Sequence, residues 1–283
     1  MKVFVPGHVT FFFSPRPEEG GSIGVGACLD KGVIMEAHSG RKRDNLSGIR
    51  REVVYDISKE LEGEVHFSGR AQLPFKHGLG MSGALYLSVL LSKSIELGLG
   101  KTIEDIGEIA HSLELRRGTG LGDVIAQIRG GIDVRLKAGG PKTGKIEKLL
   151  PRKNYRVSIA PLGELETKEV LKSEKVLSRF RSVGENLLRE FLESEGDLEL
   201  AVELSKYFFE KTKLGKLMEM SNEFHLLGDS LDEKGVTWGI SMLGKTIVSI
   251  SRSGIERRVI RKTISRYVKP IECRIDPCGA RVI

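Results

Sequence analysis

Residues 74–84 read Pro74-Phe75-Lys76-His77-Gly78-Leu79-Gly80-Met81-Ser82-Gly83-Ala84, and the apolar run of residues 85–91 follows directly. The three glycines allow the backbone to turn sharply and to approach a ligand closely. The apolar run predicts a buried helix that begins near Ser82, and the N–H groups and positive dipole end of such a helix favour an anion. A glycine turn before a core helix is the alternative interpretation. We expect a polyphosphate-binding loop made by Gly78, Leu79, Gly80, Met81, Ser82, Gly83 and Ala84.

The spacing of this loop does not fit the two common nucleotide fingerprints. No Gly-Lys-Ser or Gly-Lys-Thr closes it, and no Gly-x-Gly-x-x-Gly follows a first strand. The pattern after Pro74 instead resembles the second motif of the GHMP kinases, the superfamily of galactokinase, homoserine kinase, mevalonate kinase and phosphomevalonate kinase. Met81 stands where many members have another serine. The resemblance implies that the loop holds the phosphates of ATP.

Three further segments carry the same resemblance. Residues 118–131 resemble the catalytic segment, in which Asp123 precedes the pair Gly130-Gly131 by a fixed interval. Residues 5–10 resemble the first motif, which enters the substrate site. Residues 239–246 occupy the place of the third motif, although they contain fewer glycines than usual.

Within the superfamily, the closest resemblance is to the archaeal pantoate kinases. They share Pro-Gly-His at residues 6–8, Gly-Leu-Gly-Met-Ser-Gly at 78–83 and Thr-Gly-Leu-Gly-Asp-Val at 119–124. This resemblance implies transfer of the ATP γ-phosphoryl group to the 4-hydroxyl of pantoate, giving 4-phosphopantoate for coenzyme A synthesis. Composition and periodicity say nothing about the acceptor. Another kinase of the superfamily, acting on homoserine, shikimate or mevalonate, and a non-catalytic ligand sensor both stay open.

The resemblance assigns roles to three acidic or hydroxyl side chains. Asp123 is the expected base or hydroxyl-orienting carboxylate, with a helix cap as the alternative. Glu114 is expected to bind Mg²⁺, with a solvated carboxylate or a partner of Arg116 or Arg117 as the alternative. Ser82 is expected to contact magnesium or phosphate, and it is also a candidate N-cap.

Four side chains are candidates for contact with the substrate. His8 either binds the substrate or packs as a turn histidine on the core, and the sequence does not decide between the two. Ser22, Arg16 and Arg129 are weaker candidates for the pantoate carboxylate, which a guanidinium suits by bidentate pairing.

Composition limits the function classes. The 283 residues, 40% hydrophobic and 29% charged, are typical of a soluble protein, and neither a membrane span nor a signal peptide is present, so we expect a cytoplasmic protein without a membrane partner. The net charge of +7 is spread along the chain and aromatic residues are few, which argues against nucleic-acid binding. Cys28, Cys273 and Cys278 indicate neither a disulfide framework nor zinc. Whether the chain forms a homodimer stays open.

The element pattern predicts an α+β protein with a domain boundary near residue 150. The resemblance implies the two-domain GHMP kinase fold, with the active site in the cleft between an ATP-binding domain at 1–150 and a second domain at 151–283. Two strand fragments are expected on either side of His8, and a tight turn at residues 30–32. Thr102 and Asp105 predict a near capping box on the helix that carries Glu114, and a short helix should run from Asp123 to Gly130. We expect mostly helix over 167–227 and strand over 236–250 and 257–275.

Overall fold

The computed structural model describes residues 1–40, 44–151, 153–165 and 173–283, and its strands form two sheets. The larger sheet has the order β11-β1-β2-β4-β3, and β5 extends it from β2 to β6. The smaller sheet has the order β10-β7-β9-β8. The strands of the larger sheet are β1 (Lys2–Arg16), β2 (Gly21–His38), β3 (Asn45–Ser47), β4 (His66–Ala71), β5 (Ile132–Lys137), β6 (Lys145–Leu149) and β11 (Arg281–Val282). Those of the smaller sheet are β7 (Arg156–Pro161), β8 (Trp238–Ser241), β9 (Thr246–Ser251) and β10 (Ile271–Arg274).

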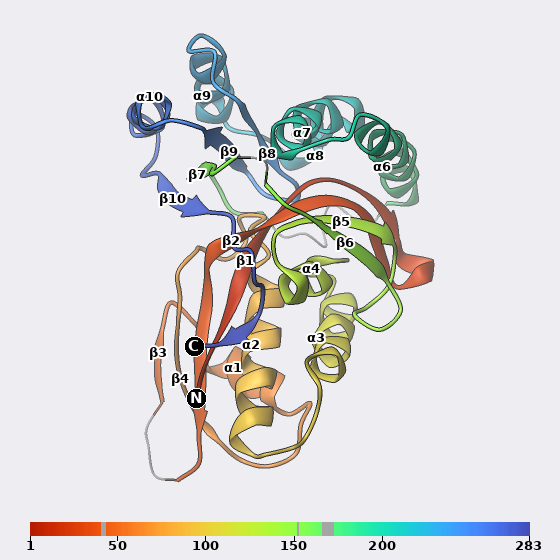
Figure 1. Ribbon diagram of the computed structural model, residues 1–283, viewed down its shortest axis with the longest axis vertical. Helices are drawn as coiled ribbons and strands as arrows, with labels where there is room; N and C mark the ends of the chain where they lie inside the picture. The colour runs from red at the N-terminus through yellow and green to blue at the C-terminus, as the bar shows by residue number, and fades with distance from the viewer. Residues whose placement is uncertain (41–43, 152, 166–172) are drawn as a thin grey trace.

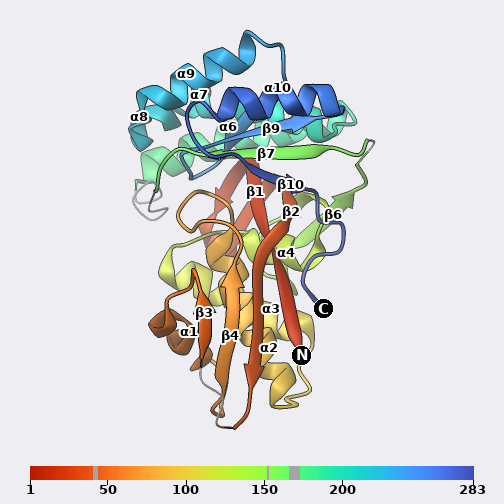
Figure 2. The same ribbon diagram turned by 90° about the vertical axis from the view of Figure 1, so that its left-hand side faces the viewer.

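Helices cover the sheets in two groups (Figures 1 and 2). The first group packs beside the larger sheet and comprises α1 (Arg51–Ser58), α2 (Met81–Glu96), α3 (Ile103–Arg117) and α4 (Asp123–Arg129). The second group lies around the smaller sheet and the curved end of β1, and comprises α6 (Glu174–Glu193), α7 (Leu198–Thr212), α8 (Leu214–Met218), α9 (Asn222–Asp232) and α10 (Gly254–Ile264). A 3₁₀ turn, η1 (Pro17–Glu19), joins β1 to β2. The mixture of helices and sheets confirms the predicted α+β class.

An aromatic cluster joins the two groups. Phe12 and Phe13 of β1 contact Phe191, Phe180 and Phe208 of α6 and α7, with ring centroids 5.5–6.1 Å apart. All five rings are buried. Because aromatic side chains bury large apolar areas, this cluster anchors α6 and α7 on β1.

The first two strands are longer than the sequence pattern predicts. The prediction of two fragments around His8 is wrong, because β1 continues through that residue with register shifts between Pro6 and Gly7 and between Thr10 and Phe12. The predicted turn at residues 30–32 is wrong as well. Gly32 pairs with Pro6 and Leu29 pairs with Gly7, so residues 30 and 31 are accommodated as a bulge in β2.

Local signals predicted several helices correctly. The capping box of Thr102 and Asp105 is present at the start of α3, and α4 runs from Asp123 to Arg129 before Gly130. The expectation of strand over 257–275 is wrong for its first part, which forms α10. Ser253 caps this helix by accepting the Glu256 N–H, and this cap outweighs the strand preference of the β-branched residues that follow. Residues 166–172 of the predicted helical region lie outside the described residues.

The predicted domain boundary near 150 falls between β6 and β7, where the chain passes from the larger sheet to the smaller one. The chain nevertheless returns at its C-terminal end, since Val282 and Arg281 of β11 pair with Val3 and Phe4 of β1. Both termini therefore lie beside one another (Figures 1 and 2). Among the helices of the described residues, none has the length and apolarity needed to cross a bilayer.

Candidate active site

The glycine loop before α2 leaves a row of backbone donors without protein partners. Gly78 and Gly80 have positive φ angles of 70° and 61°, and Gly80 is the N-cap of α2. A Cβ atom on Gly80 would lie 2.8 Å from Cβ of His8, so the loop also needs glycine for close packing. Within the described part of the chain, none of the N–H groups of residues 78–82 donates a hydrogen bond. The loop is thus a set of donors that converge at a helix N-terminus.

These donors face a pocket of about 660 Å³. Loop residues 78–82 form one wall and residues 119–123 form another. Met242 and Leu243, which connect β8 to β9, complete it from the smaller sheet. The remaining lining residues are Thr10, Phe13, Ser22, Lys76 and Arg135. The pocket is therefore lined by residues from both parts of the molecule, and its role as the active site stays a prediction.

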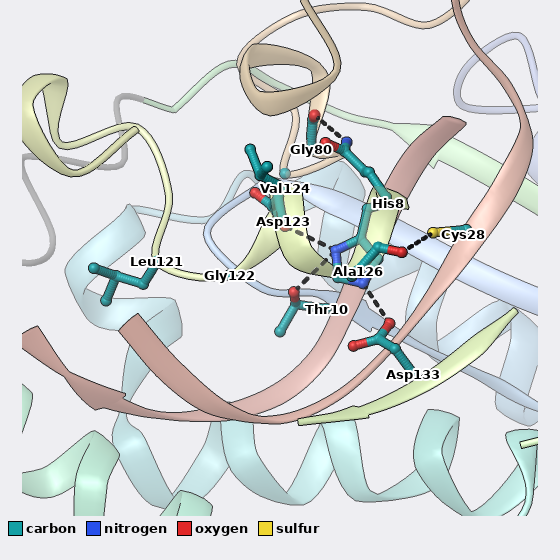
Figure 3. A network of polar contacts seen from close by, with 12 residues as sticks. His8, Thr10, Cys28, Gly80, Leu121, Gly122, Asp123, Val124, Ala126 and Asp133 are labelled. Carbon is teal, nitrogen blue, oxygen red and sulfur yellow. Dashed lines mark hydrogen bonds and ion pairs between the residues drawn. The ribbon is translucent and has the colours of Figure 1, made fainter. Parts of the chain in front are cut away.

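His8 links the carboxylates of Asp123 and Asp133 (Figure 3). Its Nδ1 lies 2.7 Å from Oδ1 of Asp123, and its Nε2 lies 2.6 Å from Oδ2 of Asp133. His8 and Asp133 are fully buried, whereas the Asp123 side chain is 20% exposed. Both ring nitrogens of His8 are occupied by carboxylates, so neither is free for the predicted contact with substrate. The alternative of a turn histidine is not met either, because His8 lies within β1.

The carboxylates keep His8 protonated. Burial alone would lower the pKa of His8, but the Asp133 charge and the hydrogen bonds that His8 donates to both carboxylates outweigh burial and raise the pKa to about 9. Burial likewise disfavours the Asp133 carboxylate, yet His8 and Arg135 hold its pKa below the usual value. The pair is therefore an imidazolium next to an ionised carboxylate.

Arg135 is a cation in the pocket wall that the sequence did not reveal. Its Nη1 donates to the Gly122 carbonyl at 3.2 Å, and its Nε lies 3.6 Å from Oδ1 of Asp133. The side chain is only 2% exposed, and Nη2 has no hydrogen-bond partner among the described residues. In the sequence, Asp133 and Arg135 alternate with apolar residues on a strand, which is typical of a strand with one face exposed to solvent. Only the distant partner His8 shows that this face is buried.

Glu114 is buried behind the glycines of the pocket wall. Its Oε1 has no hydrogen-bond partner among the described residues and would lie 2.5 Å from a Cβ on Gly120. Its Oε2 lies 3.7 Å from Nδ1 of His111. Burial and the nearby Asp123 charge raise the pKa of Glu114. The alternatives of a solvated carboxylate and of a partner for Arg116 or Arg117 are wrong, because those arginines pair with Glu60 and Asp56.

The other predicted residues divide into two groups. Ser82 and Ser22 line the pocket, and Ser82 is not a helix cap, since Gly80 holds that position. Asp123 is not a cap either, since Gly122 precedes it at the N-cap of α4. Arg16 and Arg129 do not line the pocket: Arg16 pairs with Glu185 at 2.8 Å, and Arg129 is exposed at the end of α4.

Comparisons with known proteins agree with this geometry. The family model for the GHMP kinases N terminal domain matches residues 49–131. A curated pantoate kinase of Methanocaldococcus jannaschii is 31% identical over 288 residues, covering 96% of this chain and 99% of the relative. Another pantoate kinase, of Thermococcus kodakarensis, is 33% identical over 247 residues, covering 79% of this chain and 80% of the relative. The chain belongs to the pantoate kinase family of the GHMP kinases.

A solved structure described as a phosphotransferase related to the CoA biosynthesis pathway is similar to this chain, with a TM-score of 0.79 and 28% sequence identity. The match covers 99% of this chain and 98% of the chain in that structure. The similarity to the pantoate kinase of Methanocaldococcus jannaschii thus extends over both sheets.

Proposed function

We propose that this chain is an ATP-dependent kinase that transfers the γ-phosphoryl group to the 4-hydroxyl of (R)-pantoate, in archaeal coenzyme A biosynthesis. One observation carries the proposal: residues of a donor-rich loop, Asp123 and Arg135 all line one pocket. Phosphoryl transfer requires mainly positioning and charge neutralisation, which these three groups supply. The curated pantoate kinases support the choice of acceptor.

The loop is the site for the nucleotide phosphates. Its unpaired N–H groups and the positive end of α2 stabilise negative charge that builds up on the transferring group. The glycines keep side chains out of the way, so that backbone donors reach the ligand.

Asp123 is the group that acts on the acceptor. His8 holds Oδ1 in a hydrogen bond, which leaves Oδ2 to accept a hydrogen bond from the pantoate hydroxyl. As the hydroxyl oxygen bonds to the γ-phosphorus and the bond to the ADP oxygen breaks, the hydroxyl proton passes to Oδ2. The imidazolium of His8 fixes the rotamer of Asp123 throughout.

Arg135 is the candidate partner for the pantoate carboxylate. Its Nη2 is a buried donor without a partner among the described residues, on a side chain that lines the pocket. A carboxylate ligand would satisfy this donor and neutralise the charge, because guanidinium binds carboxylates well. Arg135 replaces Arg16 and Arg129 as the candidate best supported by position.

The residues present also fit magnesium. The orphaned Oε1 of the buried Glu114 is a hard oxygen ligand, and Ser82 offers a hydroxyl at the loop. Magnesium in kinases typically takes only one or two carboxylates together with the substrate phosphates, which these two side chains would match. When bound, the ion would neutralise phosphate charge.

The test is an assay of ADP release with a panel of acceptors: (R)-pantoate, homoserine, shikimate and mevalonate. Rapid turnover with pantoate alone is the expected result, and a higher kcat/KM for another acceptor would reassign the substrate. No ADP release with any acceptor would favour the ligand sensor, which the intact His8–Asp123 pair argues against. A cytoplasmic location and a homodimer stay predictions.

A further inference from the structure

Six successive carbonyl oxygens of the loop, from Phe75 to Gly80, each accept a hydrogen bond. The donors, in chain order of the carbonyls, are His77 Nδ1 (2.7 Å), Leu165 N (2.8 Å), Thr246 Oγ1 (2.8 Å), Ser241 Oγ, His8 N (2.9 Å) and Gln127 Nε2 (2.7 Å). The Gly80 carbonyl also accepts a bond from Ala84 N at 3.1 Å, in the first turn of α2. These donors come from separate parts of the fold. Protein groups therefore hold all six carbonyl oxygens, whereas no acceptor among the described residues binds the N–H groups of residues 78–82.

Peptide geometry converts these bonds into an orientation for the N–H groups. In a trans peptide the carbonyl of one residue and the N–H of the next point in opposite directions, and no cis peptide occurs among the described residues. A donor that binds the carbonyl of one residue therefore points the N–H of the next residue away from itself. The donors to the carbonyls of residues 77–80 thus orient the N–H groups of residues 78–81. Residues 78–81 all line the pocket.

Three of these donors are side chains of fully buried residues. Gln127 lies one turn after Asp123 on α4, Ser241 ends β8 and Thr246 begins β9. The Gly244 backbone between the two strands lies against His77 and Gly78 and leaves no room for a Cβ atom. The segment predicted as the third motif thus contacts the loop through two hydroxyl groups and one glycine.

We propose that Gln127, Ser241 and Thr246 are positioning residues that fix three peptide planes of the phosphate-binding loop and direct its N–H groups at the nucleotide phosphates. This rests on the proposed function only in taking the loop as a phosphate site. A peptide released from its donor can rotate and present a carbonyl oxygen to the phosphate, which replaces an attractive charge-assisted bond with repulsion. Ser241 and Thr246 would then set ATP affinity from the smaller sheet.

The experiment compares variants that remove one donor and keep the shape. Thr246→Val, Ser241→Ala and Gln127→Met each remove the hydrogen-bonding group, and Thr246→Ser retains it. Ser249→Ala is the matched control, because Ser249 is a fully buried serine on the same strand whose hydroxyl has no partner among the described residues. Dissociation constants of ATP and of tripolyphosphate are measured by calorimetry, together with the KM for pantoate and the melting temperature.

We expect Thr246→Val and Ser241→Ala to weaken ATP and tripolyphosphate binding by about tenfold or more, while the KM for pantoate changes less than about threefold. Gln127→Met should weaken binding less, because Ala84 N still holds the Gly80 carbonyl. Thr246→Ser and Ser249→Ala should bind both ligands as the wild type does. Wild-type affinity in the three donor-free variants, or an equal loss in Ser249→Ala, would overturn the inference. A wild type that binds tripolyphosphate but releases no ADP with pantoate would refute the proposed function alone.

Discussion

At the scale of single residues, the site depends on one histidine that serves two carboxylates. His8 bonds to Asp123, which faces the pocket, and to Asp133, which does not. Asp133 is held in turn by Arg135 at 3.6 Å. The positions of the reacting carboxylate and of the pocket guanidinium are thus set by one connected network.

Asp123→Asn should be nearly inactive. The amide cannot take the hydroxyl proton, and general-base or orienting assistance is typically worth roughly 10²–10⁴ in rate. Asn keeps the size of the side chain and its oxygen can still accept the bond from His8, so the melting temperature should fall little and ATP should bind as before. Steady-state kinetics and calorimetry measure these quantities. Pantoate turnover within about threefold of the wild type would remove Asp123 from the chemical step.

His8 should make stability depend on pH in the alkaline range. Its pKa rises from 6.5 to about 9 on folding, so its contribution is complete below pH 6.5 and is lost as pH rises through about 9. Asp133, whose pKa is lowered, stays ionised across this window. The free energy of unfolding should therefore drop by on the order of 3 kcal/mol over that interval, relative to His8→Gln.

Urea denaturation at several pH values measures this difference. The groups that face His8 are Asp123, Asp133 and the Thr10 hydroxyl, so no other titrating partner is expected to reverse the sign. Parallel stability curves for wild type and His8→Gln would show that the imidazolium is not formed.

At the scale of elements, the loop before α2 requires glycine for two separate reasons. Gly80 has a positive φ, and a Cβ atom on it would lie 2.8 Å from Cβ of His8 and 3.0 Å from Nε2 of Gln127. Gly98 has nearly the same φ of 60°, but a Cβ there would meet nothing within 4 Å. A comparison of substitutions at the two positions therefore separates the effect of backbone strain from the effect of close packing around the added Cβ atom.

Gly80→Ala should damage both stability and ATP use, whereas Gly98→Ala should affect stability alone. The left-handed conformation costs an alanine about 1 kcal/mol at either site. At residue 80 the added methyl also displaces His8 or the loop, so we expect the KM for ATP to rise about tenfold or more. Equal KM values for the two variants would mean that the loop does not approach the phosphates.

The sequence predicts elements well where the signal is local. The Thr102–Asp105 capping box and the Asp123–Gly130 helix needed only neighbouring residues, and both are confirmed. The bulges in β1 and β2 depend on pairing between strands, which no single strand encodes. Arg135 was not predicted for the same reason. Its ion-pair partner Asp133 is bound by His8, which lies 127 positions before Arg135 in the sequence. Motif resemblance placed Asp123 and Ser82 in the pocket, but it could not supply the groups that hold them.

At the scale of the whole molecule, the C-terminal segment contacts the end of α4 and so supports the helix that carries Asp123. Ala280 N donates to the Gln127 carbonyl at 2.8 Å, and Gly131 N donates to the Asp276 carbonyl at 2.7 Å. Both contacts fall at the end of α4, the helix that begins with Asp123. The segment 276–283 therefore belongs structurally to the larger sheet, although it follows the smaller one in sequence.

Removing residues 276–283 should lower both the melting temperature and kcat, because α4 loses its support and β1 loses its partner β11. Arg281→Ala removes the side-chain contacts with Asp276, the Gly279 carbonyl and the Phe4 ring but keeps the backbone pairing, so it should cost less stability than the truncation. Thermal unfolding and turnover of both variants test this. A truncated protein as stable and active as the wild type would contradict this supporting role.

The return of β11 to β1 also constrains how the protein is made. A ribosome that has synthesised β1 to β6 has produced six of the seven strands of the larger sheet, yet the seventh pairs with the first only after the whole smaller sheet has been translated. The edge of β1 is therefore unpaired during that interval, and an exposed strand edge is a template for wrong pairing. The larger sheet therefore cannot be completed by vectorial folding of residues 1–150 alone, because β1 gains its second neighbour only when β11 has been synthesised.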